Sequence, residues 1–264
     1  MKKVIVSAAV AVTACAAVFF LRPAERTIVA ELSGGVTMEL LPIPAGIFMM
    51  GSNDGDSSEK PVHPVTISTP FWMGKTEVTQ AQYKQMTGEN PSHFQGLENP
   101  VESVSWNDAV AFCKKLTEQE RQAGRLPEGF AYTLPTEAQW EVACRAGSST
   151  EYYFGDDADR LDEAAWYGEN SGGKTHPVAQ KLPNAWGLYD MHGNVWEWCS
   201  DWYEGGYSSG SVTDPQGPDS GTARVLRGGC YLSLASSCRS AERLRGAPSV
   251  TGSVLGFRVC LSAR

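Results

Sequence analysis

Seven cysteines and four histidines are the side chains in this 264-residue chain that are best suited to bind a transition metal. No two cysteines are spaced as Cys-x-x-Cys, the usual arrangement in structural zinc sites. The histidines, at positions 63, 93, 176 and 192, form neither His-Glu-x-x-His nor His-x-x-x-His. The sequence therefore disfavours both a structural zinc site and a histidine-based metal enzyme.

The charge balance argues against a nucleic-acid partner. The chain has 22 Lys and Arg residues against 30 Asp and Glu residues, a net charge of −8, and no cluster of basic residues. With 27 Gly and 15 Pro residues, much of the chain must be loop. The 8 Trp, 9 Tyr and 9 Phe residues argue against disorder. These observations favour one loop-rich globular domain.

The N-terminus has the layout of a bacterial export signal. Lys2 and Lys3 precede an apolar stretch, residues 4–14, and small or β-branched residues stand directly before Cys15. This resembles a lipoprotein signal, in which residues 1–14 are removed as the signal peptide and Cys15 is acylated. We expect a lipid-anchored protein of the bacterial cell envelope, displayed on the outer surface, that contacts the membrane through this anchor.

Two alternatives remain for the N-terminal region. A secretory signal cleaved elsewhere or an uncleaved anchor would also fit, because residues 18–21 prolong the apolar run. Residues 15–37 are expected to form a lipidated tether. Of these, residues 22–37 could instead contain a first strand. The folded domain is expected to cover residues 38–264.

Three segments carry the signals of a helix start. Thr79 and Thr136 each have a Gln three positions later, which is a capping box, and Ser105 precedes an apolar helical face. Gly88 ends the first of these segments, and the third ends before Gly147.

Short strands are expected elsewhere. Residues 40–51 and residues 65–73 each predict a strand, the first of them buried. After residue 147 helical periodicity disappears and aromatic- and Gly-rich loops and short strands follow. Trp140 and Trp196 are expected to be buried. Early helices, late irregular β-structure and no internal repeat indicate an α+β fold.

Six motifs occur in a fixed order. They are FWMGKTEVT at 71–79, PVESVSW at 100–106, LPTEAQWE at 134–141, GLYDMHGNVWEW at 187–198, RGG at 227–229 and GFRV at 256–259. Their order and spacing resemble the formylglycine-generating-enzyme (sulfatase-modifying factor) family over about residues 40–260. The resemblance implies the irregular C-type lectin-like fold of that family. It does not settle the activity, since one fold hosts enzymes and binders.

The resemblance predicts no copper site. The family's enzymes bind copper through two cysteines, three and eight positions after the Ser that follows the Gly-Gly of the fifth motif. Here Cys230 stands at the Ser position, Ser233 at the first copper position and Cys238 at the second. Without a thiolate pair Cu(I) lacks its soft ligands. We therefore expect a protein that is not an enzyme, with no catalytic residues.

The resemblance does imply a structural calcium ion. The ligands of the family's calcium loop map to the side chains of Asp190 and Glu197 and the backbone carbonyls of Gly193 and Val195. Such oxygen ligands suit Ca²⁺. The alternative is that both carboxylates are only hydrogen-bonded inside an aromatic-rich turn.

Two disulfides are implied by analogy with the family. They would join Cys113 to Cys260 and Cys144 to Cys238. An even number of cysteines after Cys15 in an exported chain permits such bonds.

The last 37 residues are unusual in composition. Met, Trp, Gln, Lys and Glu occur 51 times in residues 1–227 and once, as Glu242, in residues 228–264, which also lack Asn and Asp. Codons ending in a pyrimidine cannot encode those five types. Randomised adenines in Asn codons would yield the residues found here. This resembles the variable region, about residues 230–255, of diversity-generating-retroelement proteins; skewed sampling is the alternative.

The expected ligand-binding positions are those whose residues could arise from Asn codons with randomised adenines. They are Cys230, Tyr231, Leu232, Ser233, Leu234, Ser236, Ser237, Leu244, Arg245, Gly246, Ala247, Val250, Gly252, Ser253 and Val254. Loops on a rigid scaffold can vary while the core stays folded. We expect these side chains at the surface, with Tyr231 as the largest anchor, and a protein or other surface ligand as partner. A formylglycine-generating oxidase and a structural envelope lipoprotein are the rival functions.

Overall fold

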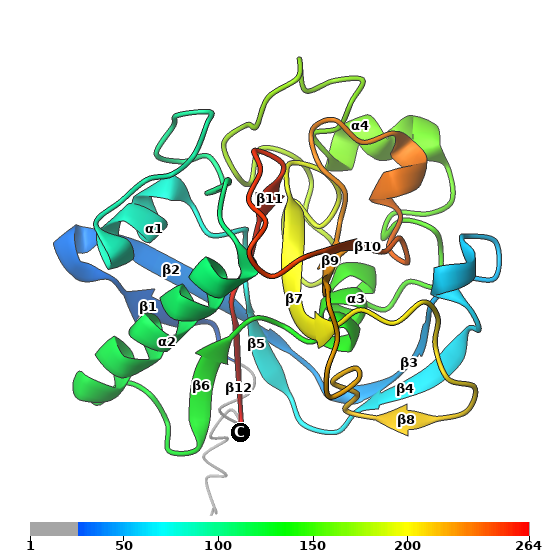
Figure 1. Cartoon of the computed structure of the whole chain (residues 1–264), viewed down its shortest axis with the longest axis horizontal. Coiled ribbons are helices and arrows are strands. Elements are labelled where there is room, and N and C mark those ends of the chain that lie inside the picture. Colours follow the sequence, from blue (N-terminus) through cyan, green and yellow to red (C-terminus); the bar gives the residue numbers. More distant parts are fainter. Residues whose placement is uncertain (1–25, 264) are drawn as a thin grey trace, which may run out of the picture.

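The computed structural model describes residues 26–263, so the predicted signal peptide and Cys15 lie outside the described residues. Figure 1 shows helices and short strands linked by long loops. The α-helices are α1 (Gln80–Thr87), α2 (Trp106–Gln122), α3 (Glu137–Arg145) and α4 (Leu161–Ala164). The fold is α+β, as predicted, with helices and three short-stranded sheets.

The three predicted helix starts are confirmed. The side chains of Thr79, Ser105 and Thr136 each accept a hydrogen bond from the backbone N–H three residues later, as N-terminal caps do. Gly88 follows α1 with φ +90°, a left-handed conformation that favours glycine. Local signals between neighbouring residues therefore set these helices.

A five-stranded sheet carries one half of the molecule. Its order is β1 (Ile28–Glu31), β2 (Thr37–Ile43), β5 (Phe71–Gly74), β12 (Cys260–Ala263) and β6 (Phe130–Thr133). β1 pairs antiparallel with β2, and Ala30 and Leu32 are buried. From residue 28 onward the chain is therefore not a tether but a first strand, which was the alternative. The side chains of Ala30 and Leu32 belong to the core.

Residues 40–51 and residues 65–73 were each expected to form one strand. Each of these segments is instead divided between two sheets. β3 (Gly46–Met50) and β4 (His63–Ile67) pair with each other and with β8 (Val212–Thr213), whereas β2 and β5 belong to the five-stranded sheet. Exposed residues at Pro44 and Ala45 separate β2 from β3. β3 is also less buried than expected, since Ile47 is 73% exposed.

The third sheet flanks the predicted variable region. Its order is β10 (Leu244–Gly246), β9 (Arg224–Arg227), β7 (Trp196–Trp202) and β11 (Leu255–Gly256). β7 pairs antiparallel with β9 and parallel with β11. Segments flanking the predicted variable region are thus held on either side of one central strand (Figure 1).

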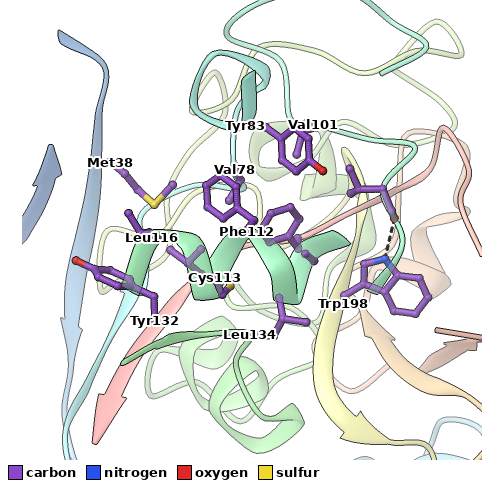
Figure 2. Close-up of a cluster of buried hydrophobic side chains, with 14 of the residues drawn as sticks. Met38, Val78, Tyr83, Val101, Phe112, Cys113, Leu116, Tyr132, Leu134 and Trp198 are labelled. Atoms are coloured by element: carbon purple, nitrogen blue, oxygen red, sulfur yellow. Dashed lines mark hydrogen bonds between the residues drawn. The ribbon is translucent and has the colours of Figure 1, made fainter. Parts of the chain in front are cut away.

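The largest core cluster lies between α2 and the sheets. Figure 2 shows Phe112, Cys113 and Leu116 of α2 among aromatic and aliphatic side chains that include Tyr83 and Trp198. Tyr83 and Phe112 stack with 5.7 Å between ring centroids. Trp140 and Trp196 are 0% and 6% exposed, which confirms the prediction that both are buried.

The six cysteines of the described chain are buried free thiols. Neither predicted disulfide, Cys113 with Cys260 or Cys144 with Cys238, is present. Cys144 Sγ instead lies 3.9 Å from the Met191 carbonyl oxygen. Desolvation favours the neutral thiol, and burial raises the pKa of Cys144 to about 12. Within residues 26–263, no helix has the length and apolar character needed to cross a bilayer.

Candidate functional site

The segment 230–254, called the C-terminal segment below, leaves β9 and returns to β11. Gly228 and Gly229 directly precede it, with φ of +97° and +80°. An ideal Cβ on Gly229 would come 2.6 Å from Cys238 Sγ, so only glycine fits at this turn. A short 3-10 helix, Ala235–Cys238, and β10 follow (orange to red in Figure 1).

Four apolar side chains of the C-terminal segment reach solvent. Leu232, Leu234, Leu244 and Val250 are 60%, 70%, 40% and 41% exposed. They make up four of the nine large exposed hydrophobic side chains among residues 26–263. Such concentration of exposed apolar residues is typical of a surface that meets a partner.

The remaining predicted positions differ in exposure. Ser236, Arg245 and Ala247 are exposed, whereas Ser237, Gly246, Gly252, Ser253 and Val254 are half-buried. Cys230, Tyr231 and Ser233 are buried. The expectation of a uniformly accessible segment is therefore wrong for these three residues.

Tyr231 is a core residue, not the exposed anchor expected from the sequence. It is 2% exposed, and its ring packs edge-on against Phe94 with 5.3 Å between centroids. Its hydroxyl lies 2.9 Å from Ser253 Oγ. Its carbonyl accepts a 2.6 Å hydrogen bond from Ser171 Oγ, and its N–H donates to the Asn194 carbonyl at 2.9 Å. Codon bias could not reveal this burial.

Buried ion pairs fix the frame of the C-terminal segment. Arg239 donates to both carboxylate oxygens of Glu59, at 2.8 and 2.7 Å. Arg243 does the same to Glu137, at 2.6 and 2.8 Å. Burial alone would raise the pKa of Glu137, yet the guanidinium groups of Arg243 and Arg227 hold it below its usual value. Bidentate pairs of this kind hold the C-terminal segment rigidly against the rest of the domain.

The predicted calcium loop places Asp190 in an unusual environment. Asp190 has φ +56°, is 1% exposed, and its Oδ2 accepts a 2.7 Å hydrogen bond from the Ala179 N–H. Its Oδ1 is buried with no hydrogen-bond partner among the described residues. Burial raises the pKa of Asp190 to about 6. A buried carboxylate oxygen without a partner is costly, so the atom is suited to a cation.

Glu197 is already engaged. Arg258 Nε and Nη2 donate to its two carboxylate oxygens, each at 2.6 Å, and Trp140 Nε1 donates to it at 2.7 Å. The hydrogen bonds of the alternative are therefore present at this residue, and they leave acceptor capacity on its Oε1. Gly193 has φ +82°, and an ideal Cβ there would come 2.2 Å from the Trp166 carbonyl oxygen. The loop thus requires a glycine at that position.

Glu77 belongs to the same cluster, although the sequence did not indicate it. Its two carboxylate oxygens accept hydrogen bonds from the Val195 N–H at 3.2 Å and from Asn194 Nδ2 at 3.0 Å. Burial, with Asp190 and Glu197 nearby, raises the pKa of Glu77. Its only signal was its place in the first family motif, because its contacts lie far away along the chain.

The residues fit a calcium ion that also uses backbone ligands. Within residues 26–263, no three His, Cys, Asp or Glu side chains are placed to hold a metal by themselves. The carboxylates of Glu77, Asp190 and Glu197 are buried near one guanidinium, that of Arg258. A divalent cation would offset this surplus negative charge, with carbonyl oxygens completing its ligands.

The residues at the copper positions do not fit copper. Ser233 accepts a 2.9 Å hydrogen bond from the Cys230 N–H and is a hard oxygen donor. Burial raises the pKa of Cys238, which keeps the thiol protonated. Cu(I) requires deprotonated or thioether sulfur, so this donor set is unsuited to it.

Known proteins are similar to this chain in sequence or in structure. A formylglycine-generating enzyme of Streptomyces coelicolor is 38% identical over 205 residues, which cover 72% of this chain and 60% of that enzyme. The solved structure of Treponema denticola variable protein 1 is 34% identical and superposes with a TM-score of 0.80, over 89% of this chain and 98% of that one. PvdO from Pseudomonas aeruginosa is 30% identical with a TM-score of 0.72, over 85% of this chain and 94% of that one.

The match to the enzyme spans less than two thirds of its length. The match to the variable protein covers nearly all of that chain. Residues 30–263 match the sulfatase-modifying factor enzyme 1-like domain. The chain therefore belongs to the sulfatase-modifying factor enzyme 1-like domain family.

Proposed function

We propose that this protein is a non-catalytic, surface-displayed lipoprotein that binds a variable ligand through its C-terminal segment. The observation that carries the proposal is the exposure of Leu232, Leu234, Leu244 and Val250 within the segment of biased composition. Likeness to a variable protein over most of the chain supports the same function. The partner is a protein, because a group of exposed apolar side chains suits a protein contact.

The contacts to the ligand come from the exposed part of the segment. Leu232 and Leu234 precede the 3-10 helix, and Leu244 and Arg245 lie on β10. The buried Cys230, Tyr231 and Ser233 support the loops from beneath and do not contact the ligand. Substitution at exposed positions then changes specificity without disturbing the frame.

Two supporting features belong to the proposal. Cys15 carries the lipid that holds the protein on the outer face of the envelope. A calcium ion bound by Asp190 and Glu197 with the carbonyls of Gly193 and Val195 stabilises the loop beside the C-terminal segment. It performs no chemistry on a substrate, and Glu77 adds negative charge around it.

The gene itself gives a direct test of diversification. We expect a reverse-transcriptase gene nearby. We also expect a second, imperfect copy of the 3′ end of the gene. In that copy, the codons that correspond to the exposed residues should have adenine at their first two positions. Codons for Arg239 and Arg243, which hold the frame, should be the same in both repeats. Absence of a repeat and of the enzyme would contradict diversification and favour a structural envelope lipoprotein.

The oxidase alternative has its own test, motivated by the identity to the Streptomyces enzyme. The purified protein should not bind Cu(I) in competition with a chelator, because Ser233 replaces the first ligand. The Ser233→Cys variant is the matched control, since it restores that thiol. Tight Cu(I) binding by the unaltered protein, lost in Cys238→Ser, would contradict the non-catalytic proposal.

A further inference from the structure

A cavity of about 460 Å³ is lined by none of the exposed apolar residues of the C-terminal segment. The loop that follows β7, which includes β8, covers it, and the first turn of α3 and strands β3 and β4 form its floor. In Figure 1, β3, β4 and β8 lie together at the lower right. This volume is within the range of small-molecule sites.

Asp201 is the residue that gives the cavity a chemical preference. It lines the cavity and is 4% exposed. Its Oδ2 accepts hydrogen bonds from the Glu137 N–H at 2.9 Å and from Ser200 Oγ at 3.0 Å. Its Oδ1 has no hydrogen-bond partner among residues 26–263. One acceptor of a nearly buried carboxylate is therefore left for a ligand.

The loop covers Asp201 closely because of a glycine. Gly217 has φ +69°, and an ideal Cβ there would come 3.0 Å from Asp201 Cβ and 3.1 Å from the Trp202 carbonyl oxygen. A larger residue would push the loop away. The covering is thus built into the sequence.

His63 provides a second acceptor. It lines the cavity, is 4% exposed, and its Nδ1 lies 3.0 Å from the Pro61 carbonyl oxygen. Donation from Nδ1 leaves Nε2 with a lone pair. The ring packs against Tyr207 with 4.8 Å between centroids, which fixes its orientation.

The charges around the cavity are predominantly negative. Asp201, Glu137 and Glu204 line it together with Arg243, and Arg243 and Arg227 both pair with Glu137, which leaves Asp201 and Glu204 as the unpaired carboxylates of the lining. Burial and the nearby Glu137 carboxylate raise the pKa of Asp201 to about 7. A bound cation would favour the ionised form of this carboxyl.

The rest of the lining is apolar or uncharged. It includes Met50, Val212, Pro215 and Pro218. A ligand that fits must therefore carry N–H donors at one end and a short apolar stem at the other.

We propose that this cavity binds a primary ammonium or guanidinium group on a short apolar stem, with Asp201 Oδ1 as the counter-charge. Such a group is found on a free small amine and on a Lys or Arg side chain of a partner. The site is independent of the ligand proposed for the C-terminal segment.

Calorimetric titration with n-butylamine and n-butylguanidine tests the proposal, with n-butanol as the uncharged control. We expect both cations to bind and n-butanol to bind at least about tenfold more weakly, as charge-assisted hydrogen bonds predict. Equal binding of n-butanol would overturn the proposal, as would no binding of either cation. N-acetyl-lysine methylamide distinguishes a partner's side chain from a free amine. If it binds at least as tightly as n-butylamine, the natural ligand is a partner's side chain. If it binds more weakly, the natural ligand is a free amine.

Two variants locate the binding. Asp201→Asn should weaken butylamine binding at least about tenfold, although it also alters the contact with α3. Ser208→Trp leaves that contact intact and fills the cavity from its exposed rim, and the neighbouring Ser209→Trp, which does not line the cavity, is the matched control. Binding lost in Ser208→Trp and kept in Ser209→Trp supports the site. Binding unchanged in Ser208→Trp overturns it.

Discussion

The hydroxyl of Tyr231 and Oγ of Ser253 lie 2.9 Å apart, so the beginning and the end of the C-terminal segment are joined beneath its exposed loops. Tyr231 also packs on Phe94 and is 2% exposed. This contact divides the segment into a buried support and an accessible surface. Diversity at the surface is then compatible with a fixed fold.

Replacing Tyr231 should therefore destabilise the protein. Tyr231→Ser should lower the free energy of unfolding by about 3–5 kcal/mol, as for other large-to-small changes in a core. Tyr231→Phe should cost about 0.5–1.5 kcal/mol, because only the hydrogen bond to Ser253 is lost. Urea unfolding measures both. Leu232→Ser is the control and should stay within about 0.5 kcal/mol, since Leu232 is exposed; a neutral Tyr231→Ser would show that Tyr231 is not a core residue.

Calcium should stabilise the protein through Asp190. Its thermal midpoint should rise with calcium concentration, because an ion that binds only the folded state stabilises it by mass action. Asp190→Asn should abolish the rise. Asp54→Asn, in an exposed acidic loop, should retain it. An equal rise in the Asp190 variant would place the ion elsewhere.

The pH dependence of stability without calcium follows from the same carboxyl. The pKa of Asp190 in the folded protein is about 6, above the value near 4 of an unfolded chain. The protonated form is thus favoured by folding, and its contribution to stability is present below about pH 4 and lost as pH rises through about 6. We expect this loss between pH 4 and 7 to disappear in Asp190→Asn. An identical pH profile for both proteins would contradict the assignment.

Trp140 should be essential for the core behind the calcium loop. Its ring is 0% exposed and its Nε1 donates to Glu197. Trp140→Ala should lower the free energy of unfolding by about 3–5 kcal/mol in chemical denaturation. A loss below about 1 kcal/mol would be inconsistent with its packing.

The lipid anchor rests on the sequence around Cys15. Cys15→Ser should abolish metabolic labelling by palmitate and release the protein from membranes. Cys113→Ser, at a buried thiol of the domain, should leave labelling unchanged. Labelling that persists in Cys15→Ser would refute lipidation at this residue.

Local signals predicted the helices, whereas contacts between distant residues were beyond the sequence. The caps at Thr79 and Thr136 depend on residues three positions away and were predicted correctly. The contact of Glu77 with Asn194 joins residues that only the fold brings together. The burial of Tyr231 was missed for a related reason, because codon composition indicates which residues vary but not which way a side chain points.

The central claim is most directly tested with a protein ligand selected from a display library against the natural chain. The binding constant should be measured for a variant with Ser at Leu232, Leu234, Leu244 and Val250. The matched control places Ser at four other exposed apolar residues, Ile47, Met49, Leu97 and Leu182. We predict that the first variant loses at least about tenfold in affinity while its melting temperature stays within a few degrees, as for surface substitutions, and that the control binds normally. Normal binding by the first variant together with loss of binding by the control would contradict the proposal that the C-terminal segment is the binding surface.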